Sequence, residues 1–172
     1  TMAARRVRSP MRQPDWKSWA TDPAGCSAGT CVTAWWRAGT KAAPGEASPQ
    51  DLASFRAETW SGDMQLWWRG AKVGDTLSLA FDAPSAGRYD VFGAFTRAPD
   101  YGLHGLAING TAAGNQLDFF AEKVEPTGEI PLGAFDLQAG ANKLDVRCDG
   151  KNPKARPGHM FGLDYIRLVK TP

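Results

Sequence analysis

The chain contains 172 residues, with 20 basic and 18 acidic side chains and a formal charge of +2. This length suits one domain with a hydrophobic core plus a tail, because domains commonly contain ~100 to 200 residues. The near-neutral charge argues against nucleic acid as a partner, and the absence of any apolar run near ~20 residues argues against membrane insertion.

The first 56 residues carry weak structural signals. Residues 1–15 are basic and contain proline, which predicts a disordered segment without the apolar stretch of a signal peptide. Residues 16–56 form either an N-terminal extension or a first strand with its loop, and Val32–Arg37 is the candidate strand. Ser48–Phe55 has the pattern of a short capped helix with proline at its first position, and an irregular loop is the alternative. Four tryptophans of this region require burial or a ligand: Trp16, Trp19, Trp35 and Trp36.

Two of the three cysteines lie close together in a glycine-containing loop. This loop is flexible enough to close a small disulfide between Cys26 and Cys31. Cys148 instead occupies an apolar position of a strand. The spacing of Cys26 and Cys31, without a nearby histidine, does not fit a zinc site or a haem attachment site. We therefore expect a Cys26–Cys31 disulfide, an oxidising compartment, and a secreted, periplasmic or cell-surface location.

Strand signals dominate from Asp63 onward. Met64–Arg69 is the first run, and Thr76–Phe81 alternates between apolar and small or polar residues. Its apolar face consists of Leu77, Leu79 and Phe81. The next strand is apolar on both faces, as expected near the middle of a sandwich. Tyr89, Val91 and Phe95 share one of its faces, and Phe92 lies on the other.

The second half of the chain contains hairpins. Asn109-Gly110 is the strongest hairpin signal, with Leu103–Ile108 before it and Leu117–Ala121 as the candidate partner. Lys143–Cys148 and Phe161–Leu168 follow as further strands. Short strands joined by turns predict an all-β antiparallel β-sandwich over residues 57–172, a fold that often carries binding loops at its ends.

Aromatic side chains are the first candidates for a binding site. The C–H faces of sugars stack on flat rings, and Trp60, Trp67, Trp68 and Tyr101 lie near strand ends. Because successive strand residues point to opposite faces, at most one of Trp67 and Trp68 is a ligand platform, and burial of both is the alternative.

Polar loop residues form two further candidate clusters. Arg97 and Asp100 adjoin Tyr101 on a turn, where they either hydrogen-bond sugar hydroxyls or only hold the turn. Lys151 and Asn152 begin a loop that runs to His159. The cations of this loop, with His159, either favour an anionic glycan or are simply solvated.

Several motifs, in their order along residues 57–170, carry a family resemblance. They are Trp60-Ser61-Gly62, Gln65-Leu66-Trp67-Trp68, Ala98-Pro99-Asp100-Tyr101-Gly102, Val124-Glu125-Pro126-Thr127-Gly128 and Gly150-Lys151-Asn152-Pro153. This order resembles the galactose-binding-like jelly roll of carbohydrate-binding module families six and thirty-five. It is most similar to the accessory domain that follows the catalytic domain in some glycoside hydrolase family 172 proteins.

The resemblance implies a function and a ligand set. It implies a non-catalytic module that binds an oligo- or polysaccharide, contacts it through Asn152, and is attached to a glycoside hydrolase catalytic domain. It also implies a structural calcium ion, for which Asp164 is the matching position. The Glu-x-Glu expected in the first strand is missing, so Glu58 is the substitute, and a structurally hydrogen-bonded Asp164 is the alternative.

Catalytic alternatives have less support in the sequence. Asp118, Glu122 and Glu125 supply carboxylates for a small glycosidase or lyase, but the spacing that such chemistry needs is not visible in a sequence. His104 lies on the same face of its predicted strand as Leu106 and Ile108, which predicts a buried, paired side chain. We therefore predict a domain without catalysis that tethers a glycan-degrading enzyme to its polysaccharide. The alternative is a structural domain that packs against a catalytic domain or forms an oligomer.

Overall fold

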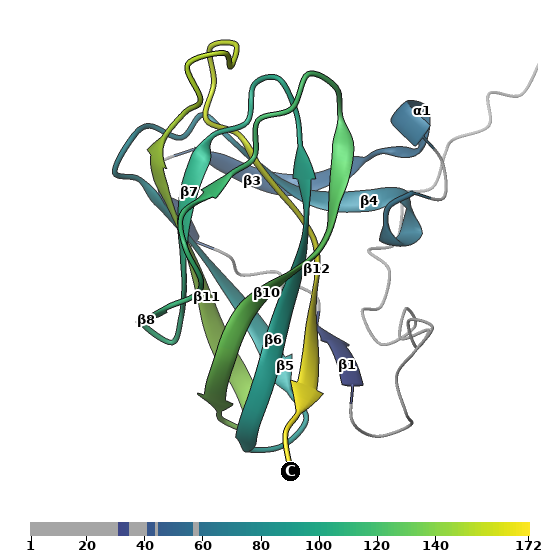
Figure 1. The fold of residues 1–172 in the computed structure, drawn as a ribbon, viewed down its shortest axis with the longest axis vertical. Helices are drawn as coiled ribbons and strands as arrows, with labels where there is room; N and C mark the ends of the chain where they lie inside the picture. The colour runs from purple at the N-terminus through teal and green to yellow at the C-terminus, as the bar shows by residue number, and fades with distance from the viewer. Residues whose placement is uncertain (1–30, 35–40, 44, 57–58) are drawn as a thin grey trace, which may run out of the picture.

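Two antiparallel β-sheets face each other across one hydrophobic core (Figure 1). This arrangement comes from a computed structural model, which describes residues 31–34, 41–43, 45–56 and 59–172, with side chains from residue 45 onward. Over that part of the chain each sheet contains six strands. The predicted fold class, an all-β antiparallel sandwich, is confirmed.

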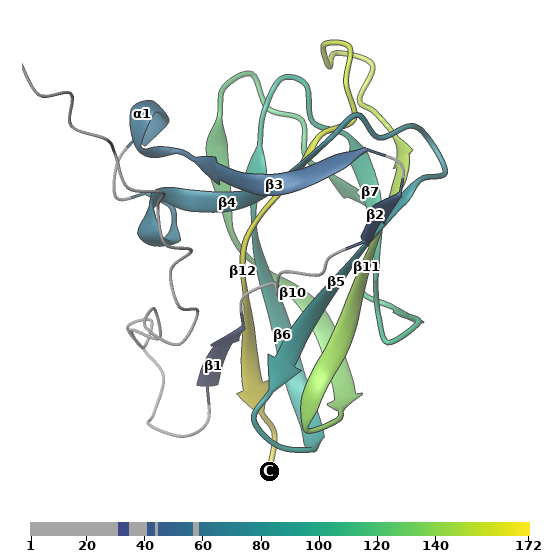
Figure 2. The ribbon, with the colours of Figure 1, turned by 180° about the vertical axis from the view of Figure 1, so that it is seen from behind.

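The first sheet, called sheet A, runs in the order β10-β6-β12-β4-β3, and β1 pairs with β12. Its strands are β1 (Cys31–Ala34), β3 (Glu46–Asp51), β4 (Met64–Arg69), β6 (Gly87–Arg97), β10 (Glu125–Leu137) and β12 (Phe161–Lys170). The long strands β6 and β12 lie inside this sheet and the long strand β10 forms one edge, while the shorter β3 and β4 cross the upper part of the molecule (Figure 2).

The second sheet, called sheet B, runs in the order β2-β5-β11-β7-β8, and β9 pairs with β7. Its strands are β2 (Lys41–Ala43), β5 (Thr76–Ala83), β7 (Leu103–Ile108), β8 (Thr111–Ala112), β9 (Leu117–Asp118) and β11 (Gly140–Gly150). The register places Leu144 between Leu79 and Ile108, so apolar residues of three strands meet on the inner face.

The core confirms the predicted alternation. Leu77, Leu79 and Phe81 of β5 are buried, as are Leu144, Val146 and Cys148 of β11. Burial also raises the pKa of the Cys148 thiol. Side chains between these positions, such as Ser78 and Asp145, point away from the core because strand residues alternate in direction.

His104 lies within an aromatic cluster of the core. Its ring centroid is 5.9 Å from those of Trp68 and Phe119 and 5.3 Å from that of Phe161. Nε2 lies 3.1 Å from the backbone oxygen of Met160, and burial is the main cause of the lowered pKa of the imidazole. A neutral Nε2–H donates this hydrogen bond, so the predicted buried and paired histidine is confirmed.

The predicted turn is present, but the strand that follows it directly is Thr111–Ala112, and only Leu117–Asp118 of the predicted partner Leu117–Ala121 pairs with β7. Asn109 and Gly110 have φ angles of 49° and 84°, as the favoured two-residue turn between antiparallel strands requires. β7 pairs with β8 immediately after this turn, and β9 then pairs with the beginning of β7.

The helix predicted over Ser48–Phe55 is wrong for its first half. Ser48 to Asp51 belong to β3, which pairs with β4 along its whole length. Pro49 is tolerated because β3 is an edge strand, where a missing N–H breaks no ladder between two neighbours. The helix α1 is confined to Ala53–Arg56, and Asp51 Oδ1 accepts a 2.9 Å hydrogen bond from the Ala53 N–H at its start.

The strands before residue 57 pair within both sheets, through β1 with β12, β2 with β5 and β3 with β4. The division of the chain at residue 57 stays a prediction. The predicted Cys26–Cys31 disulfide and the four early tryptophans involve positions or side chains outside those that the structure describes. In the described part of the chain, no helix has the length and apolar character needed to cross a membrane.

Candidate functional site

Two of the predicted aromatic platforms are buried. Trp60 and Tyr101 each expose only 4% of their surface. The Trp60 indole N–H donates a 2.9 Å hydrogen bond to Thr96 Oγ1, and the Gln65 amide donates one of 2.9 Å to the Tyr101 hydroxyl. Neither ring therefore offers an open stacking face in this structure.

Trp67 and Trp68 point to opposite faces of β4, as predicted. Trp68 is fully buried in the core, whereas Trp67 is half-buried on the outer face of sheet A. The Arg69 guanidinium lies 4.8 Å from the centre of the Trp67 ring. Trp67 is thus the most accessible of the four predicted rings, and a cation already covers part of it.

The polar loop residues are held by partners within the protein. Arg97 forms a 2.9 Å ion pair with Glu125. Asp100 is half-buried, and its backbone oxygen accepts a 3.2 Å hydrogen bond from the Met160 N–H. The structure thus directs Arg97 toward Glu125 and fixes Asp100 against the start of β12.

Asn152 is held in a similar way. Its amide donates a 2.6 Å hydrogen bond to Asp118 Oδ2, and its own oxygen accepts one of 2.9 Å from the Lys154 N–H. The Arg156 N–H binds the Pro99 oxygen at 2.7 Å, which joins loop 151–160 to loop 98–102. Both loops lie at the end of the sandwich opposite the C-terminus (Figure 1). Lys151, the first residue of loop 151–160, is exposed.

Asp164, the predicted calcium ligand, is 6% exposed on β12. Its two carboxylate oxygens lie 3.1 and 3.2 Å from the Ser61 N–H, which donates to them. Burial raises its pKa to about 6. Calcium needs ~6 to 8 oxygen ligands, and the described residues contain no group of three His, Cys, Asp or Glu placed to hold a metal. Asp164 alone does not make such a site, and Glu58 lies outside the described residues, so calcium stays a prediction.

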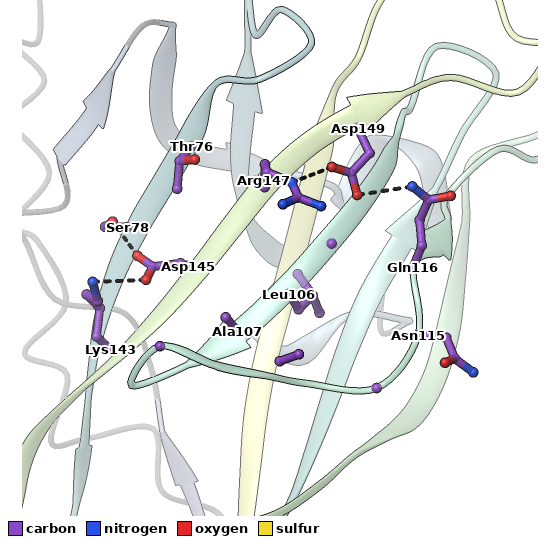
Figure 3. Close-up of a pocket in the computed structure, with 14 residues that line it drawn as sticks. Thr76, Ser78, Leu106, Ala107, Asn115, Gln116, Lys143, Asp145, Arg147 and Asp149 are labelled. Carbon is purple, nitrogen blue, oxygen red and sulfur yellow. Dashed lines mark hydrogen bonds and ion pairs between the residues drawn. The ribbon is translucent and has the colours of Figure 1, made fainter.

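An open groove lies on the outer face of sheet B (Figure 3). Its volume is about 670 Å³, and its lining comes from β5, β11, β7 and the segment around β8. Strand alternation explains its position, because residues between the buried positions of β7 and β11 must point outward.

Small residues leave space at the base of this groove. Gly105 and Ala107 of β7 line it, between the buried His104, Leu106 and Ile108. A Cβ atom on Gly105 would lie 2.9 Å from Asp149 Oδ2. The absence of a side chain at position 105 is therefore part of what keeps the groove open.

Two polar clusters flank the groove. In the upper cluster, Arg147 Nε donates to Asp149 Oδ1 at 2.5 Å and Gln116 Nε2 donates to Asp149 Oδ2 at 3.0 Å. The Arg147 hydrogen bond is the main cause that lowers the pKa of Asp149, and the same bond raises the pKa of Arg147. Asp149 is therefore ionised at neutral pH.

The lower cluster repeats this arrangement. Ser78 Oγ donates to Asp145 Oδ1 at 2.5 Å, and Lys143 Nζ forms a 2.9 Å ion pair with Asp145 Oδ2. Both clusters lie on the same face of sheet B, so charged and hydroxyl groups converge along β11 (Figure 3).

Sequence reasoning did not find this groove. The outward parity of Lys143, Asp145 and Arg147 was visible, together with small residues at alternate positions of Leu103–Ile108. What the pattern lacked was the sheet order, because only the pairing of β11 with both β5 and β7 places these residues side by side.

Neither a known protein-family model nor a curated protein sequence matches this chain. Among solved structures, the chain is similar to a xanthan lyase from Paenibacillus, at 22% identity and a TM-score of 0.63 over 80% of this chain and 13% of the lyase. A family 35 carbohydrate-binding module from Clostridium thermocellum matches at 15% identity and a TM-score of 0.48, over 83% of this chain and 99% of the module.

A third match is a β-(1,4)-mannanase from Podospora anserina, named as a GH26-CBM35 protein. It has 14% identity and a TM-score of 0.49, over 83% of this chain and 28% of the mannanase. The chain thus spans only a small part of both enzymes. At these identities the likeness concerns the fold alone.

Proposed function

We propose that this protein is a non-catalytic carbohydrate-binding module, and that the groove on sheet B is its binding site. The observation that carries the proposal is a groove of about 670 Å³ lined by paired donors and acceptors on a floor of small residues. Ligand sites commonly have volumes of ~300 to 1,000 Å³ and a few convergent polar groups.

The chemistry of the lining matches hydroxyl groups. A sugar hydroxyl donates one hydrogen bond and accepts others. Arg147 and Lys143 expose 64% and 55% of their side chains and have N–H groups beyond those used in their ion pairs. The carboxylates of Asp145 and Asp149 have lone pairs to accept from the same ligand. Recognition here would depend on hydrogen bonds rather than on stacking.

The shape favours a chain over a single sugar. The lining residues of β11 extend from Lys143 to Asp149, which is about 20 Å at the ~3.4 Å rise of an antiparallel strand. Contact with both polar clusters requires only the step from Asp145 to Arg147, about 7 Å, whereas a ligand that fills the whole row must extend over the full distance. An oligo- or polysaccharide meets that requirement.

The state of Asp149 supports binding rather than hydrolysis. Cleavage of a glycosidic bond by two carboxyl groups needs one that stays protonated at the working pH. The pKa of Asp149 is lowered by Arg147, so this group does not serve as that acid. Elsewhere Glu125 is paired with Arg97, and Asp118 holds Asn152.

We further propose that the domain tethers a glycan-degrading enzyme to its polysaccharide outside the cell. Tethering raises the local concentration of an attached catalytic domain without chemistry of its own. The support is the sequence resemblance to accessory domains of glycoside hydrolases, including the family 172 proteins. Fusion of this domain to a catalytic domain should raise its activity on insoluble polymer but not on a short soluble substrate.

The direct test is binding of the intact chain to a panel of polysaccharides by affinity electrophoresis and calorimetry. Gly105→Val fills the groove floor and must displace the Asp149 carboxylate, whose Oδ2 would lie 2.9 Å from the new Cβ, so it should lose binding at least about tenfold, with circular dichroism to check its fold. Ala141→Val, on an exposed position of β11 outside the groove, is the matched control. Full binding by Gly105→Val would exclude the groove as the binding site. No binding of any polysaccharide by the wild type would exclude the proposed carbohydrate-binding function.

A second function is favoured by a different surface. Phe55 and Met64 expose 54% and 37% of their surfaces, close to where β3 and β4 meet α1 (Figure 2). Exposed apolar side chains near each other are common in protein interfaces. If the domain packs against a catalytic domain or its own copy, a Phe55→Ser, Met64→Ser double variant should weaken that association in sedimentation without changing glycan binding.

A further inference from the structure

The charges that line the groove cancel. Its ionisable residues are two cations, Lys143 and Arg147, and two carboxylates, Asp145 and Asp149. Each cation lies beside one of these carboxylates, at 2.9 Å and 2.5 Å respectively. The cationic loop residues after position 150, which the sequence analysis linked to an anionic glycan, do not line the groove.

The carboxylates are held in place more firmly than the cations. Asp149 exposes 12% of its side chain and Asp145 exposes 20%. Gln116 and Ser78 hold the remaining oxygens of these two carboxylates through hydrogen bonds. The negative charges are thus fixed features of the site, and a ligand cannot displace them by rotating one exposed side chain.

From this arrangement we infer that the groove selects neutral glycans and discriminates against polymers of uronic acids. The inference rests on the proposed function, whose ligand class it narrows. A carboxylate on the ligand that approaches Arg147 or Lys143 also approaches Asp149 or Asp145, so repulsion offsets its attraction. A hydroxyl gains the same hydrogen bonds without that repulsion and with a smaller cost of leaving water.

The test compares affinities for neutral and anionic polymers in the same protein. The neutral probes are soluble glucan, mannan, xylan and galactan, and the anionic probe is polygalacturonate. We expect wild type to bind at least one neutral probe about tenfold or more tighter than polygalacturonate. Binding to the neutral probe should change little between low and moderate salt, because no net charge is neutralised.

Asp149→Asn is the decisive variant because it leaves Arg147 without its anionic partner while keeping an oxygen for Gln116. It should shift the preference toward polygalacturonate by about tenfold. Asp136→Asn removes the same charge from an exposed pair with Arg88 that does not line the groove, and it should leave the preference unchanged. Because a ratio of two affinities does not depend on the fraction of folded protein, partial unfolding of a variant would not change this preference.

The outcomes separate this inference from the function on which it rests. Tighter binding of polygalacturonate than of every neutral probe by wild type would overturn the neutral preference and leave carbohydrate binding in place. An unchanged preference in Asp149→Asn would also overturn it, because the carboxylate would then not set the selectivity. Failure to bind any of the five polymers would instead overturn the proposed function.

Discussion

The outer faces of the two sheets use their side chains in opposite ways. On the sheet A side, Trp60 is buried and hydrogen-bonded to Thr96 of β6, and the carboxylate of Asp164 is almost fully covered. On sheet B, Gly105 and Ala107 leave an open groove, and charged residues pair along its sides. Trp60, on the sheet A side, is covered, whereas the open groove of sheet B has no aromatic residue among its lining residues.

The side chains that stabilise the fold and the side chains that we propose for ligand binding therefore lie on different faces. A tryptophan near a turn is equally typical of a sugar platform and of a local core, and burial at Trp60 favours the second. An ion pair on an exposed strand contributes little to stability, so the loss of one pair on sheet B should change stability little. Variants on the two faces should therefore have different effects.

Among these variants, Trp60→Ala on the sheet A side should cause the largest loss of stability. Loss of a buried tryptophan should lower the free energy of unfolding by about 3–5 kcal/mol, because the ring is covered and its N–H is paired with Thr96. Urea denaturation measures this change. Glycan affinity per folded molecule should stay at the wild-type value, and a variant that kept its stability but lost binding would make Trp60 a ligand platform after all.

A smaller effect should come from Asp164→Asn and should depend on pH. The pKa of Asp164 is raised to about 6 in the folded protein, against ~3.9 in an unfolded chain. The unfolded state therefore ionises first, and this group lowers stability as pH rises from about 4 to about 6, by about 2–3 kcal/mol in total. Above pH 6 the asparagine variant should be more stable by that amount, with no difference below pH 4.

Thermal unfolding across this pH range checks the prediction, and calcium provides its control. If Asp164 and Glu58 hold a structural calcium ion, adding calcium should stabilise the wild type and not Asp164→Asn at pH 7. In that case the asparagine variant would be the less stable of the two in calcium.

The smallest stability effect should come from Arg147→Gln on sheet B. Its side chain is exposed and its partner Asp149 keeps a hydrogen bond from Gln116, so the unfolding midpoint should match that of the wild type within error. Affinity for a neutral glycan should nevertheless fall by about tenfold because a shorter amide with fewer N–H groups replaces the guanidinium. A large loss of stability with unchanged affinity would assign Arg147 to the fold and remove the contrast between the two faces.

Alternation along the strands was sufficient to predict the sandwich and much of its core. Leu77, Leu144 and Val146 are buried as their parity required, and Asn109-Gly110 forms its hairpin because few other dipeptides tolerate two positive φ angles. The same local reasoning was wrong at Ser48, where pairing with β4 outweighed a helix-start pattern. Short-range signals fail where a partner strand decides the structure.

The sequence by itself determined which residues point inward, since a strand has a fixed period of two whatever its neighbours are. Only the tertiary structure decided which outward residues meet, because the order of strands in a sheet depends on pairings between distant segments. Those pairings buried Trp60 and Tyr101, and they brought Gly105, Arg147 and Asp149 together at one groove.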